Sequence, residues 1–144
     1  MASADTSNAP ADNAANPFIG LRPFDIDDAD RFFGRNTQTY ELLRRLHTLH
    51  FVAVLGPSGC GKSSLIRAGV LAALRNGYLA DEGDWTIAML EPGADPLASW
   101  TRHLTPYLKP GCAPEALLTD PADALDTTRG PLVILVDQFE DLFR

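Results

Sequence analysis

The chain has 144 residues, of which 45% are hydrophobic, so it has the size of one ordinary domain and enough apolar material for a core. Its formal net charge of −7 argues against free-standing electrostatic binding to nucleic acid or to an anionic membrane, because both need a basic surface. Any phosphate that the protein binds must therefore be held by a local arrangement of residues.

The cysteine content and the hydropathy pattern indicate a reducing, cytoplasmic setting. Cys60 and Cys112 are too few for a disulfide scaffold and lack the spacing of a zinc site. No apolar run approaches the roughly 18 to 20 residues of a membrane span, and the first basic residue is Arg22. We therefore expect neither a signal peptide nor a membrane contact in this segment.

The first 35 residues divide into two parts of different composition. Residues 1–17 are dominated by Ala, Asn, Asp, Ser and Pro without any aromatic residue, and are predicted to be a disordered tail. In residues 18–35 apolar side chains are frequent and glycine and proline punctuate them, which indicates a structured lead-in. The remaining residues, 36–144, are predicted to belong to the domain itself.

A helix, a strand and a second helix are predicted next along the chain. Residues 37–49 place leucines at helical spacing, and Asn36 can serve as the N-cap. Residues 51–55 are continuously apolar and precede a Gly-Pro pair, which is typical of a strand buried on both faces. After a glycine-rich turn, a helix is expected over about 62–74, with Gly77 as its stop signal.

The second half of the chain predicts two further strands, at 86–90 and 132–136, separated by helices. Asp95 and Pro96 have the pattern of an N-cap and first helical residue, and an apolar stripe with Leu97 continues that helix to Pro106. Short helices are expected near 114–118 and after Asp120. Strands that alternate with helices predict a parallel α/β sheet.

The glycine-rich turn fits the phosphate-binding loop pattern, or Walker A motif, and it lies between a predicted strand and a predicted helix. Its glycines allow backbone N–H groups to turn toward a polyphosphate, and the helix that follows adds free N–H groups and the positive end of its dipole. Lys62 would reach the β- and γ-phosphates and Ser63 would bind Mg²⁺. The nucleotide-binding residues expected here are Gly56, Pro57, Ser58, Gly59, Cys60, Gly61, Lys62, Ser63 and Ser64.

The strand at 132–136 delivers a carboxylate at its C-terminal end, where open α/β sheets bind ligands. Asp137 would hold Mg²⁺ beside Ser63, as a Walker B carboxylate does. Glu140 could polarise the attacking water, or it could only favour the N-terminus of the next helix. Together these motifs predict a three-layer P-loop NTPase fold with a parallel sheet.

Several residues near these motifs have a structural interpretation beside the functional one. Cys60 needs only its backbone in the loop, although the helix N-terminus could lower its thiol pKa. Ser58 and Ser64 are expected to be loop and helix-face residues and not catalytic groups. Arg67, on the helix after the loop, is interpreted as a solvated side chain.

Four segments in order resemble the novel STAND NTPase module, over roughly residues 16–144. They are Gly-Leu-Arg-Pro-Phe at 20–24, residues 28–35 ending in Phe-Phe-Gly-Arg, the loop running on into Leu-Ile-Arg-Ala-Gly at 65–69, and Asp-Gln-Phe-Glu-Asp-Leu-Phe at 137–143. The resemblance implies an ATP-dependent signal-transduction switch, with sensor or effector repeats as partners. It also implies that Gly34 and Arg35 border the adenine and ribose, and that Asp137 and Glu140 serve the metal and hydrolysis.

The resemblance further implies a strand that follows the Asp137 strand and inserts between it and the strand at 51–55. Because the sequence stops shortly after Asp137, we expect either an incomplete sheet or two directly adjacent strands, as in kinase-type and GTPase-type P-loop folds. We interpret residues 36–144 as the N-terminal portion of the domain, with slow or absent hydrolysis.

Three functions are compatible with these patterns. The first is an ATP- and Mg²⁺-dependent switch module, and no NKxD-like guanine-reading motif favours GTP. The second is a non-catalytic interaction fragment whose open sheet edge pairs with another copy or with a separately encoded remainder. The third is a small-molecule kinase. It ranks lowest because such a kinase needs an Arg-rich lid, and residues 80–125 contain no arginine other than Arg102.

Overall fold

The computed structural model describes residues 20, 22–79, 83–128 and 130–143. The predicted disordered tail at 1–17 lies outside the described residues. The described elements are, in order, η1 (Ile26–Arg31), α1 (Asn36–Leu49), α2 (Lys62–Ser64), η2 (Leu65–Leu71), α3 (Ala72–Arg75), β1 (Thr86–Leu90), α4 (Pro96–Leu104), η4 (Thr105–Tyr107), α5 (Ala116–Thr119), α6 (Pro121–Ala124), β2 (Leu132–Val136) and η5 (Phe139–Phe143).

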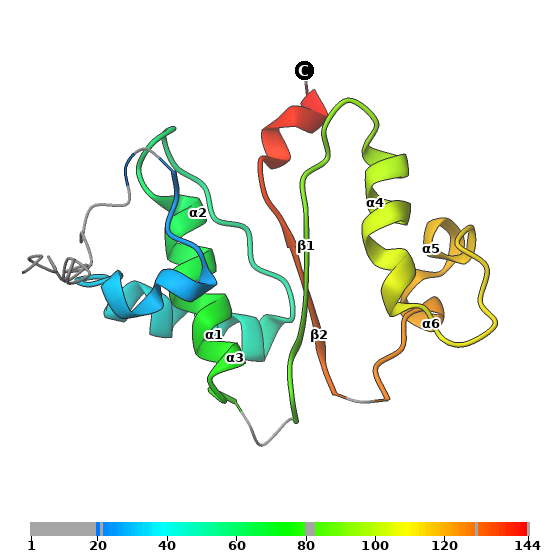
Figure 1. Cartoon of the computed structure of the whole chain (residues 1–144), viewed down its shortest axis with the longest axis horizontal. Helices are drawn as coiled ribbons and strands as arrows, with labels where there is room; N and C mark the ends of the chain where they lie inside the picture. The colour runs from blue at the N-terminus through cyan, green and yellow to red at the C-terminus, as the bar shows by residue number, and fades with distance from the viewer. Residues whose placement is uncertain (1–19, 21, 80–82, 129, 144) are drawn as a thin grey trace, which may run out of the picture.

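Two parallel strands form the middle layer of the molecule, with α1 to α3 on one side and α4 to α6 on the other (Figure 1). They pair in register from Thr86 opposite Leu132 to Leu90 opposite Val136. Both strands were predicted with these boundaries, and the mixed α/β fold is confirmed. Their side chains serve two separate cores, because alternate residues of a strand point to opposite faces.

The first core lies between the sheet and the helices that precede it in the sequence. Leu43 of α1 packs with Leu71 and Leu74 of the helix after the loop, and Ile87 and Val133 of the strands cover them. The predicted helix at 37–49 is confirmed as α1. The predicted N-cap, Asn36, is wrong by one residue. The carbonyl of Arg35 accepts the first helical hydrogen bond, and Asn36 is already helical.

The helix after the loop is continuous from Lys62 to Arg75, as predicted to within one residue, but its middle segment η2 is a π-helix. Gly69 lies in that segment and packs against Thr39 of α1, so closely that a Cβ on Gly69 would lie 2.6 Å from the Thr39 hydroxyl oxygen. Gly77 follows the helix in the left-handed conformation, φ 87°, as expected of a helix stop.

The second core lies on the other face, under α4 to α6. The Asp95 side chain accepts a hydrogen bond from the Ala98 N–H, which confirms the predicted N-cap of α4. Leu104 is fully buried, whereas Leu97 is exposed, so its predicted place in the apolar stripe is wrong. Ser99 takes the buried position near the N-terminus of α4, where its hydroxyl donates to the Glu91 carbonyl.

The predicted strand at 51–55 is wrong in this structure, because this segment pairs with no described strand. Phe51 and Leu55 are 78% and 91% exposed, while Val52 and Val54 are half-buried. This period-two alternation is that of a strand with one covered face. A strand needs a hydrogen-bonded neighbour, and among the described residues β2 pairs only with β1. The direct adjacency of kinase-type and GTPase-type folds is therefore not seen in this part of the chain.

Candidate nucleotide-binding site

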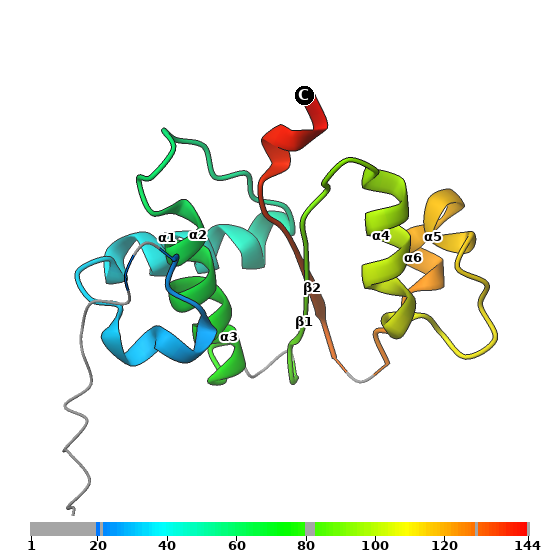
Figure 2. The same cartoon turned by 45° about the horizontal axis from the view of Figure 1, so that its top comes forward.

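The glycine-rich loop and the C-terminal end of β2 approach each other at one end of the molecule (Figure 2). The loop joins the unpaired segment at 51–55 to the first turn of α2. Carboxyl ends of parallel strands are where α/β folds bind ligands, because loops and helix N-termini converge there. Two of the predicted site residues, Ser63 and Asp137, meet at this end of the sheet.

The loop is exposed to solvent, and the side chain of its own lysine donates hydrogen bonds across it. Gly59 and Gly61 adopt left-handed conformations, φ 76° and 83°, which side chains with a Cβ rarely adopt. The Lys62 ammonium donates hydrogen bonds to the carbonyls of Gly56, at 2.9 Å, and Pro57, at 3.1 Å. A bound phosphate would have to draw the ammonium away from these carbonyls.

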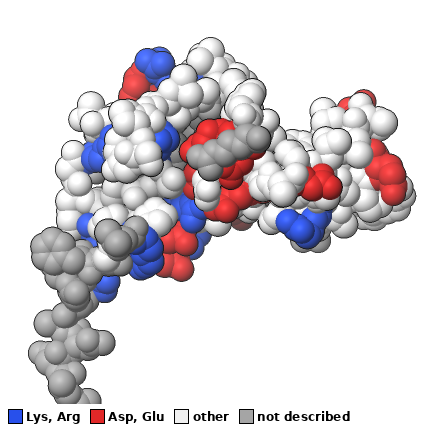
Figure 3. Space-filling model, turned by 90° about the horizontal axis from the view of Figure 1, so that it is seen from above, with Lys and Arg blue, Asp and Glu red and all other residues white. Residues whose placement is uncertain are grey.

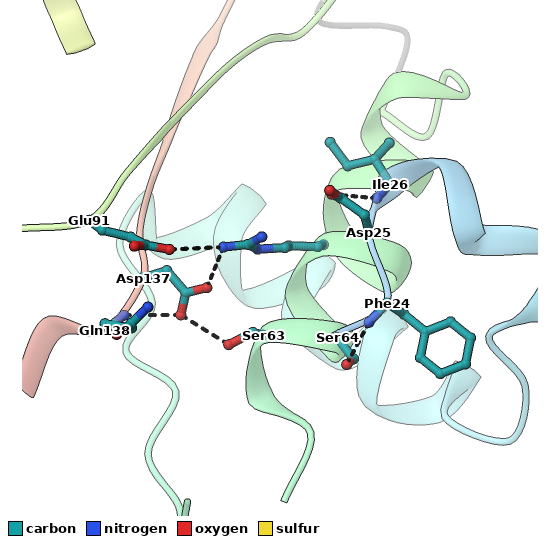
Figure 4. A network of polar contacts seen from close by, with 9 residues as sticks. Phe24, Asp25, Ile26, Ser63, Ser64, Glu91, Asp137 and Gln138 are labelled. Carbon is teal, nitrogen blue, oxygen red and sulfur yellow. Dashed lines mark hydrogen bonds and ion pairs between the residues drawn. The ribbon is translucent and has the colours of Figure 1, made fainter. Parts of the chain in front are cut away.

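Ser63 and Asp137 lie together, although 74 positions separate them in the sequence. The Ser63 hydroxyl donates to Asp137 Oδ1 at 3.0 Å, and the backbone N–H of Gln138 donates to the same oxygen at 3.0 Å (Figure 4). The Asp137 side chain is 17% exposed. This neighbourhood of a hydroxyl and a carboxylate offers the oxygen ligands that Mg²⁺ prefers.

The donor set near Ser63 also fits the way in which Mg²⁺ is usually held. Among the described residues no group of three or more His, Cys, Asp or Glu side chains could hold a metal ion. Mg²⁺ commonly uses one or two protein ligands and completes its octahedron with water and substrate phosphates. The residues present therefore fit a magnesium ion that arrives with a nucleotide.

Arg67 is the residue that the sequence interpretation missed. It was expected to be solvated, but its side chain is only 20% exposed, and its Nη2 group donates to Asp137 Oδ2 at 2.8 Å. The same nitrogen lies 3.4 Å from Glu91 Oε1, at the end of β1. Arg67 follows Ser63 by four residues, a spacing that places both on one helix face and could have identified it.

The lead-in residues contact the loop and its helix from outside. Arg35 donates from Nη1 to the carbonyls of Cys60, at 3.1 Å, and Gly61, at 3.4 Å. The Ser64 hydroxyl accepts a hydrogen bond from the Phe24 N–H at 3.1 Å. Arg35 and Ser64 therefore tie the lead-in to the phosphate loop and its helix.

The remaining predicted site residues are exposed. Gly34 has φ 83° and is exposed, as are Ser58 and the free thiol Cys60 of the loop. Glu140 lies in η5 with its side chain exposed, and no described hydrogen bond or ion pair joins it to Lys62 or Asp137. The structure thus joins Ser63 to Asp137 by a hydrogen bond, while the adjacent Lys62 bonds to the loop carbonyls and no described hydrogen bond links Glu140 to any of the three.

A shallow depression of about 370 Å³ adjoins Asp137 on the side of α4. It is lined by side chains of both charges, among them Arg67, Glu91, Arg102, His103 and Asp137. Seen from this end of the molecule, acidic atoms gather near the centre with basic atoms around them (Figure 3). The surface is therefore not a basic patch, in keeping with local binding of phosphate by a loop.

Comparison with known proteins identifies the family. Residues 17–144 match the family described as novel STAND NTPase 1. Over 63 residues, 44% of this chain, it is 35% identical to a phosphate import ATP-binding protein PstB of Idiomarina loihiensis. Over 57 residues, 37% of this chain, it is 37% identical to an aliphatic sulfonates import ATP-binding protein SsuB of Bacillus cereus.

The match spans 20% of the length of the first relative and 22% of the second. No solved structure gives a significant match. None of the helices in the described part of the chain has the length and the apolar run that a membrane crossing requires.

Proposed function

Because the chain belongs to the novel STAND NTPase 1 family, we propose that it binds ATP with Mg²⁺ and serves as the nucleotide-binding part of a signalling switch. Membership of the family and the likeness to ATP-binding proteins indicate nucleotide binding. The hydrogen bond between Ser63 and Asp137 carries the proposal, because it joins the phosphate loop to the carboxylate at the end of β2.

Each residue has a defined part in this proposal. Lys62 exchanges its loop carbonyls for phosphate oxygens, and the N–H groups at the start of α2 add hydrogen bonds to the phosphates. Ser63 and Asp137 hold Mg²⁺, which when bound would neutralise charge on the β- and γ-phosphates. Arg35 fixes the loop carbonyls from the outside and, with Gly34, borders the adenine and ribose.

Hydrolysis is proposed to be slow or absent in this chain. Phosphoryl transfer depends on positioning and electrostatics, so a residue that activates water must be held near the γ-phosphate. Glu140, the residue proposed for that role, is exposed in η5. We place the protein in the cytoplasm as part of the same proposal.

The proposal is tested by the melting temperature of the chain with ATP, with and without Mg²⁺, and with GTP. A ligand that binds only the folded state raises stability, by about 2.7 kcal/mol at a hundred times its Kd. We expect a rise with Mg·ATP and a smaller rise for Ser63→Ala, which lacks the metal-binding hydroxyl. A melting temperature that Mg·ATP leaves unchanged would contradict the proposal.

A second candidate function is association through the open edge of the sheet. It is favoured by the unpaired edge of β2 and by the exposed apolar side chains of Phe51 and Leu55. Unpaired strand edges readily accept a further strand, from another copy or from a separately encoded partner such as a sensor repeat. Light scattering during size-exclusion chromatography tests self-association, and a constant monomer mass over a hundredfold concentration range, about 1 to 100 μM, would count against it.

A further inference from the structure

The guanidinium of Arg67 is shared between two carboxylates of different exposure. Its Nη2 group is 2.8 Å from Asp137 Oδ2 and 3.4 Å from Glu91 Oε1, and these carboxylate side chains are 17% and 52% exposed. Its Nε atom is buried and has no hydrogen-bond partner among the described residues. The guanidinium therefore gives up few hydrogen bonds if it turns from one carboxylate to the other.

Asp137 does not depend on Arg67 for its orientation. Its Oδ1 atom already accepts two hydrogen bonds, from the Ser63 hydroxyl and from the Gln138 N–H. Arg67 takes the remaining oxygen, Oδ2, and adds a positive charge beside a mostly buried carboxylate. Its distinct contribution is therefore to balance the charge of Asp137.

A divalent cation and a guanidinium that share one carboxylate oppose each other. Both are positive, and because they contact the same carboxylate in a partly buried site, their mutual repulsion is only weakly screened. Glu91, at the end of β1, contacts the same Nη2 group as Asp137 and can receive the guanidinium. A cation at Ser63 and Asp137 would thus favour the Arg67–Glu91 pair over the Arg67–Asp137 pair.

We propose that Arg67 is a resident counter-ion of Asp137 that competes with Mg²⁺ and passes to Glu91 when the metal binds. This inference rests on the proposed magnesium site of Ser63 and Asp137. The Mg²⁺ affinity of the site would then depend on three side chains, Arg67 on η2, Glu91 at the end of β1 and Asp137 at the end of β2. Whether Arg67 pairs with Asp137 or with Glu91 at the end of β1 would therefore depend on whether Mg²⁺ occupies the site.

The test measures the free Mg²⁺ concentration that gives half of the ATP-dependent rise in melting temperature, at fixed ATP. Chelation of Mg²⁺ by ATP is common to all variants and cancels in the comparison. Arg67→Gln removes the competing charge and is expected to lower this midpoint about tenfold, the size of one charge-assisted contact. Glu91→Gln removes the alternative partner and is expected to raise it by about threefold.

Two matched variants separate charge competition from other effects. Arg67→Lys keeps the charge and should leave the midpoint within about threefold of the unmodified chain. Arg102→Gln removes a charge from the same depression, where no described hydrogen bond joins Arg102 to Asp137, and should change the midpoint by less than about twofold. An equal effect of Arg102→Gln and Arg67→Gln would overturn the proposal.

The outcomes distinguish this inference from the proposed function. If the unmodified chain gains no stability from Mg·ATP, the magnesium site itself is refuted and the inference with it. If it gains stability but Arg67→Gln has an equal or higher midpoint, only the inference is refuted. Should Arg67→Gln fail to fold, Glu91→Gln decides, and an unchanged or lowered midpoint in that variant would refute the competition.

Discussion

Cys60 offers the simplest chemical report on the phosphate loop. Its thiol is free and exposed, in the middle of the loop that would surround a polyphosphate. We expect an alkylating reagent to modify Cys60 and Mg·ATP to slow that reaction, because the bound nucleotide would cover the loop. Mass spectrometry of the labelled chain measures both cysteines.

Cys112 is the internal control, because it is a free, partly exposed thiol that follows α4 and lies outside the loop. Its labelling rate should not depend on nucleotide. Equal labelling of Cys60 with and without Mg·ATP would argue that no nucleotide occupies the loop.

The lead-in carries a pH-sensitive contact at Asp28. Two hydrogen bonds from the Arg22 guanidinium and one from the Asp25 N–H lower the pKa of Asp28 from 3.8 to about 2. A lowered pKa means that the contact stabilises the fold above about pH 4 and is lost as the pH falls through about 2. Asp28→Asn should therefore lower the melting temperature at pH 7.

The same contact predicts how that difference changes with pH. The gap in melting temperature between Asp28→Asn and the unmodified chain should close between about pH 4 and pH 2, where Asp28 itself becomes neutral. A gap that stays constant over this range would show that the ion pair with Arg22 is not its cause.

At the residue scale, motif spacing predicted the meeting of Ser63 and Asp137 but not the pairing of Arg67. A strand that ends in a carboxylate and a helix that begins after a phosphate loop converge by the geometry of α/β folds. Which arginine reaches that carboxylate depends on how the helix is rotated about its axis. The four-residue spacing from Ser63 marks Arg67 as a residue of the same helix face, but it does not show that this face turns toward Asp137.

The close contact between η2 and α1 is possible because Gly69 has no side chain. A Cβ there would lie 2.6 Å from the Thr39 hydroxyl oxygen, which is buried and donates to the Arg35 carbonyl at 3.1 Å. Gly69→Ala should therefore force the two elements apart and destabilise the fold by about 1–3 kcal/mol, the usual cost of overpacking. Denaturant unfolding monitored by circular dichroism measures the loss.

A double-mutant comparison identifies the cause of that loss. Thr39→Ala removes the hydroxyl that meets the new methyl group, so Gly69→Ala should cost less in the Thr39→Ala background. If the cost is the same in both backgrounds, the clash with Thr39 does not explain it.

At the element scale, local patterns predicted both strands of the sheet and the N-cap of α4 at Asp95. They failed for residues 51–55, whose apolar run has the composition of a buried strand. A strand needs a hydrogen-bonded neighbour as well as suitable residues, and no described strand pairs with this segment. Composition alone could not supply that neighbour.

At the scale of the whole molecule, association through the open edge of the sheet is the second proposed function. Phe51 and Leu55 are exposed, so changing both to serine should alter folding stability by less than about 0.5 kcal/mol. The same double variant should reduce any concentration-dependent association, because it removes the apolar side chains along the unpaired segment. Light scattering at matched concentrations compares the two chains, and unchanged association would place the contact elsewhere.

We propose that the loop at 56–63 binds the phosphates of ATP through Lys62, and isothermal titration with Mg·ATP measures this binding directly. The unmodified chain should bind, and Lys62→Ala should bind at least about tenfold more weakly, because a charge-assisted contact to phosphate is lost. Lys109→Ala is the matched control, since Lys109 pairs with Asp123 and lies outside the loop. Equal affinity in Lys62→Ala and Lys109→Ala, or no binding by the unmodified chain, would contradict phosphate binding through Lys62.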